Sequence, residues 1–215
     1  MSQVVLADEI NRATPRTQSA LLEAMQERQV TADGVTRALE RPFLVLATQN
    51  PVELEGTFPL PEAQVDRFLM RVTIGYPSHS EENAILERFR TADPLPDLQP
   101  VTTPAEILAL QQARRQVRVE ESVRDYVVRI ARATREIGDV QLGASPRATL
   151  ALYGAAQAWA AIHGRDYVLP DDVKTVAPTV LCHRIMIAPQ AQLRGRNAQE
   201  LITDIVTTVP VPVEA

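Results

Sequence analysis

Three polar residues able to do chemistry follow two apolar runs near the start of the chain. Asp8 and Glu9 come directly after Val4–Ala7, and Asn50 follows Phe43–Ala47 after two further residues. Short continuous apolar runs are typical of strands that are buried on both faces of a parallel sheet. Because the carboxyl ends of parallel strands meet at one edge, where α/β proteins bind ligands, we expect the three side chains to lie together.

These residue types suit chemistry on a phosphate group. An aspartate at such an edge can hold Mg²⁺ through a water, and the next glutamate can polarise a water for in-line attack. An asparagine donates and accepts hydrogen bonds, so Asn50 can position either the metal or the water. An acid pair after a strand is by itself more often a solvated turn or a first helical turn. Only its spacing relative to Asn50 favours a catalytic role.

The elements expected around these residues alternate between strand and helix. Thr14-Pro15 is typical of a helix N-terminus, and Asp33-Gly34 is a strong signal for a hairpin turn. After the first strand we expect a helix over 15–28, a hairpin over 29–39, the second strand over 43–47, a loop over 52–60, a short helix over 61–68 and a third strand over 69–74. This order predicts an α/β sheet with right-handed parallel connections.

The pattern becomes helical beyond Pro77. Capping-box pairs, apolar residues at helical spacing and terminal Gly or Pro residues recur through the rest of the chain. Helices are expected from Ser78, from Thr103, over 123–137, over 145–163, from Asp171 to a break at Pro178, and from Asn197, with a proline-rich linker over 92–102. The sequence therefore predicts an α/β domain over 1–77 and an all-α domain over 78–215.

Composition and charge exclude several classes of protein. The 215 residues carry a net charge of −5, which is the wrong sign for a dedicated nucleic-acid binder. Cys182 is the only cysteine, and the three histidines lack metal-ligand spacing, so disulfide scaffolds and protein-held zinc are not expected. The apolar stretch 150–162 is too short to cross a bilayer, and no export signal precedes the first strand. We therefore expect a cytoplasmic protein without membrane insertion.

Six motifs resemble the MoxR group of AAA+ ATPases. They are VVLADEINRA at 4–13, TQSALLEAM at 17–25, LATQNP at 46–51, LPEAQVDRF at 60–68, GASPRA at 143–148 and GRDYVLPDDV at 164–173. The resemblance covers nearly the whole chain and weakens only near 91–100 and after Ile185. It implies an α/β fold class, with a partial AAA+ parallel-sheet core followed by an all-α helical lid domain, and it implies ATP and Mg²⁺ as cofactors.

The resemblance also implies a role for each matched residue. Asp8 and Glu9 match the Walker B pair, in which Asp8 holds Mg²⁺ through water and Glu9 activates the attacking water. Asn50 matches the first sensor, Arg67 the arginine finger that reaches the nucleotide of a neighbouring subunit, and Arg147 the second sensor on the lid. A guanidinium in the first turn of a helix is physically well suited to a γ-phosphate, which supports the role of Arg147.

Simpler interpretations of the arginines stay open. Arg67 and Arg71 are four residues apart, so either can be the finger, although the motif favours Arg67. Either can instead form a surface pair with Asp66 or Glu62. Arg147 can equally be a solvated residue in a first helical turn.

The resemblance further implies a ring of identical subunits, expected to be a hexamer. Such rings have a chaperone-like role in maturing or metal-loading partner complexes, often with proteins that carry a von Willebrand factor A domain. The hairpin around Asp33-Gly34 matches an insert near the central pore, and its role stays open. Two other functions stay open as well: an inert interaction module, and a nucleic-acid motor or chelatase-type subunit. The arginines over 114–135 make nucleic-acid contact a minor alternative.

The sequence contains no phosphate-binding loop of the form G-x-x-x-x-G-K-[ST], because its one lysine is Lys174 and its glycines do not cluster. Since the family places this loop upstream of the Walker B strand, the chain resembles the C-terminal two-thirds of such a protein. On its own it is expected to be inactive as an ATPase. We also expect unpaired strand edges in a loosely packed α/β part, and a more robust helical part.

Overall fold

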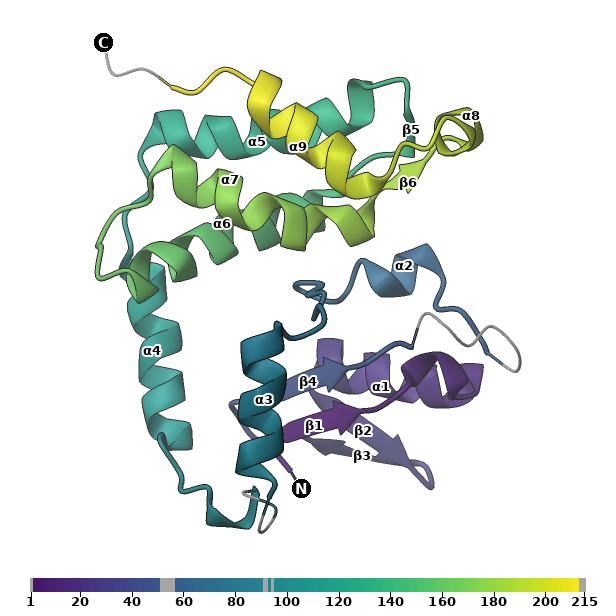
Figure 1. Cartoon of the computed structure of the whole chain (residues 1–215), viewed down its shortest axis with the longest axis vertical. Coiled ribbons are helices and arrows are strands. Elements are labelled where there is room, and N and C mark those ends of the chain that lie inside the picture. Colours follow the sequence, from purple (N-terminus) through teal and green to yellow (C-terminus); the bar gives the residue numbers. More distant parts are fainter. Residues whose placement is uncertain (1, 51–56, 91–92, 94, 213–215) are drawn as a thin grey trace.

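The computed structural model describes residues 2–50, 57–90, 93 and 95–212, and it divides into an α/β part and a helical part (Figure 1). The α/β part contains β1 (Val4–Ala7), η1 (Ile10–Arg12), α1 (Pro15–Glu27), β2 (Gln29–Ala32), β3 (Val35–Ala38), β4 (Leu44–Ala47) and α2 (Glu62–Val65). The chain then continues through α3 (His79–Arg88), η2 (Leu95–Asp97) and α4 (Pro104–Gln116). The helical part contains α5 (Glu121–Glu136), β5 (Val140–Leu142), α6 (Pro146–Ile162), α7 (Pro170–Leu181), η3 (Cys182–Arg184), β6 (Met186–Ile187), α8 (Pro189–Leu193) and α9 (Ala198–Thr208).

β1 and β4 pair in parallel and in register along their four residues, which confirms the expected pairing. The expected burial of both faces is wrong for the described residues. Four apolar side chains of the two strands expose more than half of their surface: Val4, Leu6, Leu44 and Leu46. These exposed residues alternate with half-buried ones along both strands, so one face of the two-stranded sheet lacks cover among the described residues.

The helix and hairpin after β1 form where local signals place them. The Thr14 hydroxyl accepts the Thr17 N–H at the start of α1, and Pro15 occupies the first helical position. β2 and β3 form an antiparallel hairpin whose turn residues, Asp33 and Gly34, have φ of 52° and 75°. A two-residue turn with both φ values positive matches the twist of the strands, and Gly34 adopts this conformation without steric cost.

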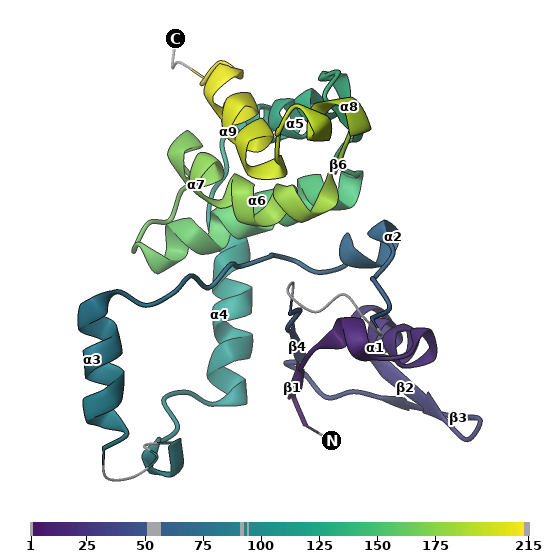
Figure 2. The same ribbon diagram turned by 45° about the vertical axis from the view of Figure 1, so that its right-hand side comes forward.

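The prediction of a third strand over 69–74 is wrong. This segment is extended but has no strand neighbour among the described residues, and Ile74 is 93% exposed. Its backbone bonds to the helical part instead, because the Arg71 N–H donates to the Thr179 carbonyl at 2.9 Å. Figure 2 shows the segment running from α2 past α6 to α3. Parts of the loop expected over 52–60 and of the linker over 92–102 lie outside the described residues.

Most fully buried apolar side chains belong to the helical part. Tyr126 and Ile130 of α5, Leu152 of α6 and Val180 of α7 are fully buried in one cluster. α3 and α4 bury none of their residues completely. Among the described residues of the α/β part, the buried apolar side chains are Ile10, Leu22 and Ala24. This distribution agrees with the expectation of a loosely packed α/β part. No helix among the described residues is long and apolar enough to span a membrane.

Two expectations for the helical part need correction. Pro178 neither interrupts nor ends its helix, because α7 continues through it to Leu181. The residues around it, Ala177 and Val180, are fully buried, and this packing offsets the backbone hydrogen bond that a proline removes. The helical part is also not purely helical, since β5 and β6 form a short antiparallel pair.

A buried ion pair stabilises the start of α7. Asp172 is only 3% exposed and accepts hydrogen bonds from both terminal nitrogens of Arg165 and from the Leu169 N–H. Burial on its own raises the pKa of Asp172, but these hydrogen bonds outweigh it and the pKa lies below the ordinary value. Stability from this carboxylate is therefore present at neutral pH and is lost as the pH falls through its lowered pKa.

We expect Arg165→Met to lower the free energy of unfolding by about 3–5 kcal/mol, because it leaves a buried carboxylate without its partner. Urea unfolding monitored by circular dichroism measures the change. Arg132→Met is the matched control, since Arg132 forms an exposed pair with Glu136 at 3.8 Å and should cost less than about 1 kcal/mol. Equal effects of the two substitutions would contradict the role assigned to the Arg165–Asp172 pair.

Candidate active site

The carboxyl ends of β1 and β4 are joined through Thr48. The Thr48 hydroxyl donates to the Asp8 carboxylate and accepts the Glu9 N–H at 2.8 Å. Its backbone closes the same corner, because the Thr48 N–H donates to the Ala7 carbonyl and the Thr48 carbonyl accepts the Ile10 N–H, both at 3.0 Å. The acid pair therefore lies at the sheet edge where the parallel pairing predicts it.

Glu9 has an unusual backbone conformation. Its φ of 47° and ψ of 53° lie in the left-handed region, which a residue with a Cβ adopts only at a cost. The side chain is partly exposed, and its carboxylate pairs with the Arg12 Nε at 3.0 Å. Strained residues of this kind are concentrated at functional sites, where the surrounding contacts hold them in place.

Sequence reasoning missed Thr48. The available signal was a hydroxyl residue at the first position after the second strand, opposite the acids that follow the first strand. Asn50 lies two residues further on and is half-buried, and its predicted approach to the acid pair stays a prediction.

The site suits a hydrated magnesium ion better than a protein cage. Mg²⁺ keeps most of its waters and takes one or two protein ligands together with phosphate oxygens. Asp8, with its hydroxyl neighbour Thr48, supplies that kind of donor set. No group of three or more His, Cys, Asp or Glu side chains able to hold a metal occurs in the described part of the chain.

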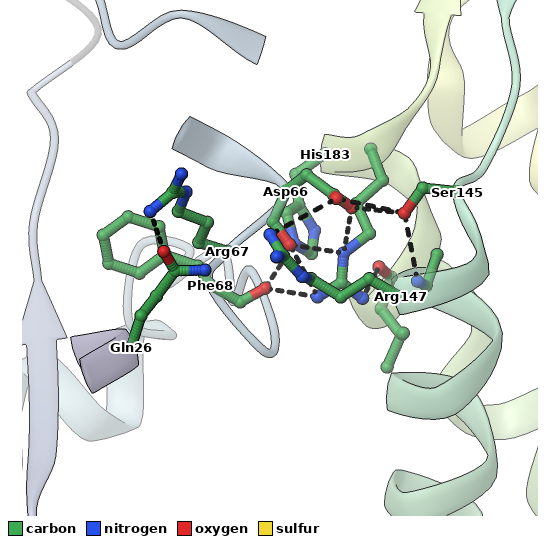
Figure 3. Close-up of polar contacts among 10 residues, drawn as sticks. Gln26, Asp66, Arg67, Phe68, Ser145, Arg147 and His183 are labelled. Atoms are coloured by element: carbon green, nitrogen blue, oxygen red, sulfur yellow. Dashed lines mark hydrogen bonds and ion pairs between the residues drawn. The ribbon is translucent and has the colours of Figure 1, made fainter. Parts of the chain in front are cut away.

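The Arg67 side chain contacts α1. Arg67 follows α2, and its terminal Nη1 donates to the side-chain oxygen of Gln26 (Figure 3). Its Nε is buried and has no hydrogen-bond partner within the described residues. The surface pairing with Asp66 or Glu62, weighed as an alternative for Arg67, is therefore not what the structure shows.

Asp66, the preceding residue, points to the helical part instead. Its two carboxylate oxygens accept the Ser145 hydroxyl at 3.2 and 3.0 Å, and its Oδ1 lies 3.2 Å from the Arg184 Nε. Arg147, in the first turn of α6, brings its Nη1 within 3.9 Å of the same carboxylate. Arg147 is half-exposed, so the solvated alternative is partly right, but it faces an anion of the α/β part.

Two residues of η3 also contact the turn after α2. The Arg184 side chain is 1% exposed and donates to the carbonyls of Asp66 and Phe68 as well as to the Asp66 carboxylate. The His183 Nε2 lies 3.1 Å from the same Phe68 carbonyl. We call these six residues the junction: Asp66, Phe68, Ser145, Arg147, His183 and Arg184 (Figure 3). It attaches the turn after α2 to the helical part.

His183 should make the fold sensitive to acid. Burial lowers its pKa below the ordinary value of about 6.5, and the nearby cations Arg184 and Arg71 act in the same direction. The hydrogen bond to the Phe68 carbonyl and the Asp66 carboxylate oppose this shift without cancelling it. The His183 Nδ1 is buried and has no hydrogen-bond partner in the described part of the chain, so a proton added there would lack an acceptor.

We therefore expect the free energy of unfolding to decrease as the pH falls below about 6.5, because the unfolded chain takes up a proton that the folded chain resists. His183→Gln should remove this component. Unfolding measured from pH 8 to pH 5 compares the two proteins. His79→Gln is the control, since His79 is exposed in the first turn of α3. Identical pH profiles for wild type and His183→Gln would contradict the prediction.

Comparison with known proteins relates each part of the chain to a known protein family. The family described as "ATPase family associated with various cellular activities (AAA)" matches residues 1–70, and the AAA lid domain matches residues 132–205. The chain is 43% identical to chaperone MoxR1 of Mycobacterium tuberculosis over 99% of its own length and 58% of that protein. It is also 50% identical to the uncharacterized protein YeaC of Bacillus subtilis, over 100% of its length and 67% of that protein.

The chain belongs to the MoxR family of AAA+ ATPases. Its fold agrees with a crystal structure from Cytophaga hutchinsonii of a protein proposed to be an ATPase. The match has a TM-score of 0.92 and 39% identity, and it covers 99% of this chain and 67% of that one. The chain thus spans from more than half to two-thirds of the length of these relatives. The match to the AAA lid lies within the helical part, and the junction joins this lid to the AAA segment.

Proposed function

We propose that this chain supplies the water-activating and phosphate-sensing residues of a Mg²⁺-dependent ATP hydrolase that works as a MoxR-type AAA+ chaperone. The observation that carries the proposal is the corner where Thr48 holds Asp8 and Glu9 at the carboxyl edge of two parallel strands. Parallel sheets of α/β proteins bind ligands at this edge. The family match to the AAA segment supports ATP as the ligand.

In this proposal each residue acts through its own chemistry. Bound with ATP, Mg²⁺ would neutralise charge on the phosphates. The Asp8 carboxylate, fixed by Thr48, accepts hydrogen bonds from waters of that ion. The Glu9 carboxylate orients and polarises the attacking water, and Asn50 positions that water or the γ-phosphate. Arg147 places a positive charge at the N-terminus of α6, which favours a γ-phosphate.

Arg67 is proposed to act on the nucleotide of a neighbouring subunit. A guanidinium that stabilises charge on the transferring phosphoryl group makes hydrolysis depend on assembly. We therefore propose a homo-oligomeric ring, with six subunits as the expected number. The family resemblance extends the proposal to a cytoplasmic ring that remodels client complexes with von Willebrand factor A domain proteins. A domain boundary near Pro77 belongs to the same proposal.

The test compares the chain with a completed chimera. In the chimera, the part of Bacillus subtilis YeaC that this chain does not cover is joined to it in the order found in that relative. Calorimetric titration with Mg-ATP should give no binding for the chain alone and micromolar affinity for the chimera, which should also release phosphate. A chimera that binds ATP without hydrolysing it would refute the proposed function and leave an interaction module as the better interpretation.

A further inference from the structure

Asp66 and Arg67 are neighbours in the sequence, but their side chains attach to different parts of the molecule. Asp66 points to the lid, and Arg67 points to α1 (Figure 3). The turn that carries the proposed finger can therefore follow either part when the two move relative to each other. The strength of the two attachments decides which part it follows.

The attachment to the lid involves buried charges and several elements. Arg184 is 1% exposed and Asp66 is 20% exposed, and Ser145 adds a hydroxyl to the same carboxylate. The carboxylate also lies at the N-terminus of α6, where the helix dipole favours an anion. Further along the segment, the Arg71 N–H donates to Thr179 of α7. Removing one partner of a buried ion pair is strongly destabilising, because the other charge stays buried without compensation.

The attachment to α1 is weaker. Among the described residues, the Arg67 side chain is attached to α1 through a hydrogen bond to the neutral, exposed side chain of Gln26. A hydrogen bond between a charged and a neutral group is weaker than a buried ion pair, and solvent exposure weakens it further. Arg67 also leaves its buried Nε without a partner among the described residues. Because the buried contacts of Asp66 are stronger than the exposed hydrogen bond of Arg67, the turn is expected to move with the lid and to slide over α1.

We propose that Asp66 is a positioning residue that fastens the Arg67 turn to the lid. This proposal rests on the proposed function, because it concerns how Arg67 is presented to a neighbouring subunit. Arg147 faces the same Asp66 carboxylate. A γ-phosphate that attracts Arg147 would shift the lid, and the lid would carry the Arg67 turn with it through Asp66. The nucleotide bound by one subunit thus controls hydrolysis in the next.

The first test needs no nucleotide. In Asp66→Asn the side chain still accepts from Ser145, but the Arg184 charge loses its counter-charge. Hydrogen exchange followed by NMR should show about tenfold faster exchange at the Arg71 amide, with unchanged protection in α5. Asp125→Asn is the matched control, because it removes an exposed carboxylate that pairs with Arg129. Wild-type exchange at Arg71 in Asp66→Asn would overturn the proposal.

Asp66→Glu distinguishes a specific loss of this attachment from general unfolding of the variant. It keeps the charge opposite Arg184, so Arg71 exchange should return to within about threefold of wild type. If Asp66→Asn loses protection throughout the lid and Asp66→Glu does not restore it, Asp66 is a structural residue and the proposal fails. Gln26→Ala should leave Arg71 exchange unchanged, because the turn follows the lid; faster exchange in this variant would also overturn the proposal.

The second test uses the completed chimera. Asp66→Asn should lower kcat with little change in KM for ATP, and the Hill coefficient should fall to about one, because the subunits no longer communicate. Wild-type cooperativity in this variant would refute the coupling. Inactivity of the wild-type chimera would instead refute the proposed function, and the exchange experiment would still decide whether Asp66 fastens the turn.

Discussion

Glu9→Gln should reduce ATP turnover by the completed chimera by at least about 10²-fold while leaving ATP affinity within about threefold of wild type. Glutamine has the same length, and its backbone N–H can still donate to the Thr48 hydroxyl. The amide cannot take up a proton from the attacking water, so it loses the general-base contribution. Single-turnover phosphate release measures the chemical step, and titration calorimetry measures ATP binding.

The control for this prediction is Glu27→Gln. Glu27 is an exposed residue at the end of α1, so its substitution removes the same charge from the same part of the fold. It should leave turnover unchanged. Unaltered turnover in Glu9→Gln would refute the proposed role of Glu9 and would direct attention to Asn50 as the group that positions water.

Arg67→Ala should lower turnover by about 10³-fold or more, the range typical of arginine fingers. This expectation agrees with the contacts of Arg67 among the described residues, where its guanidinium donates to the neutral side chain of Gln26 and forms no ion pair with a carboxylate. The loss should appear in kcat, since the charge that Arg67 stabilises develops in the transition state. Arg71→Ala tests the alternative finger. A large loss of turnover in Arg71→Ala, with none in Arg67→Ala, would identify Arg71 as the arginine finger instead.

Mixing two inactive variants tests action between subunits. Rings that contain both Arg67→Ala and Glu9→Gln subunits include sites where an intact Glu9 faces an intact Arg67 from its neighbour. Such rings should recover part of the activity, in proportion to the number of these sites. Recovery would also require that the chimera assembles, which size-exclusion chromatography with light scattering measures. Mixed rings that stay inactive would contradict action in trans.

Local signals in the sequence predicted much of the fold. Thr14-Pro15, Asp33-Gly34 and the paired caps at helix starts act within a few residues, so their outcome depends little on the rest of the molecule. The prediction of a third strand over 69–74 was wrong because a strand depends on a distant part of the molecule. A strand needs a neighbour that accepts its hydrogen bonds, and the apolar pattern of the segment carries no information about such a neighbour.

The same distinction separates the parts of the site. The proximity of Asp8, Glu9 and the end of β4 follows from parallel pairing, and the structure shows it. The contacts of Asp66 could not be predicted, because they join residues about 79 and 118 positions apart that share no periodicity. The catalytic roles rest on family resemblance and stay predictions. Thr48 was within reach of sequence reasoning, since it directly follows the second strand.

The left-handed backbone of Glu9 has a consequence for protein engineering. Glycine and asparagine adopt this conformation more easily than glutamate, so either should raise the melting temperature. A directed-evolution campaign that ranks clones by heat resistance alone would therefore enrich replacements at the position proposed to activate water. Clones with these replacements would resist heat better but would lack the proposed general base. Position 9 should therefore be left unchanged in a library designed for thermostability.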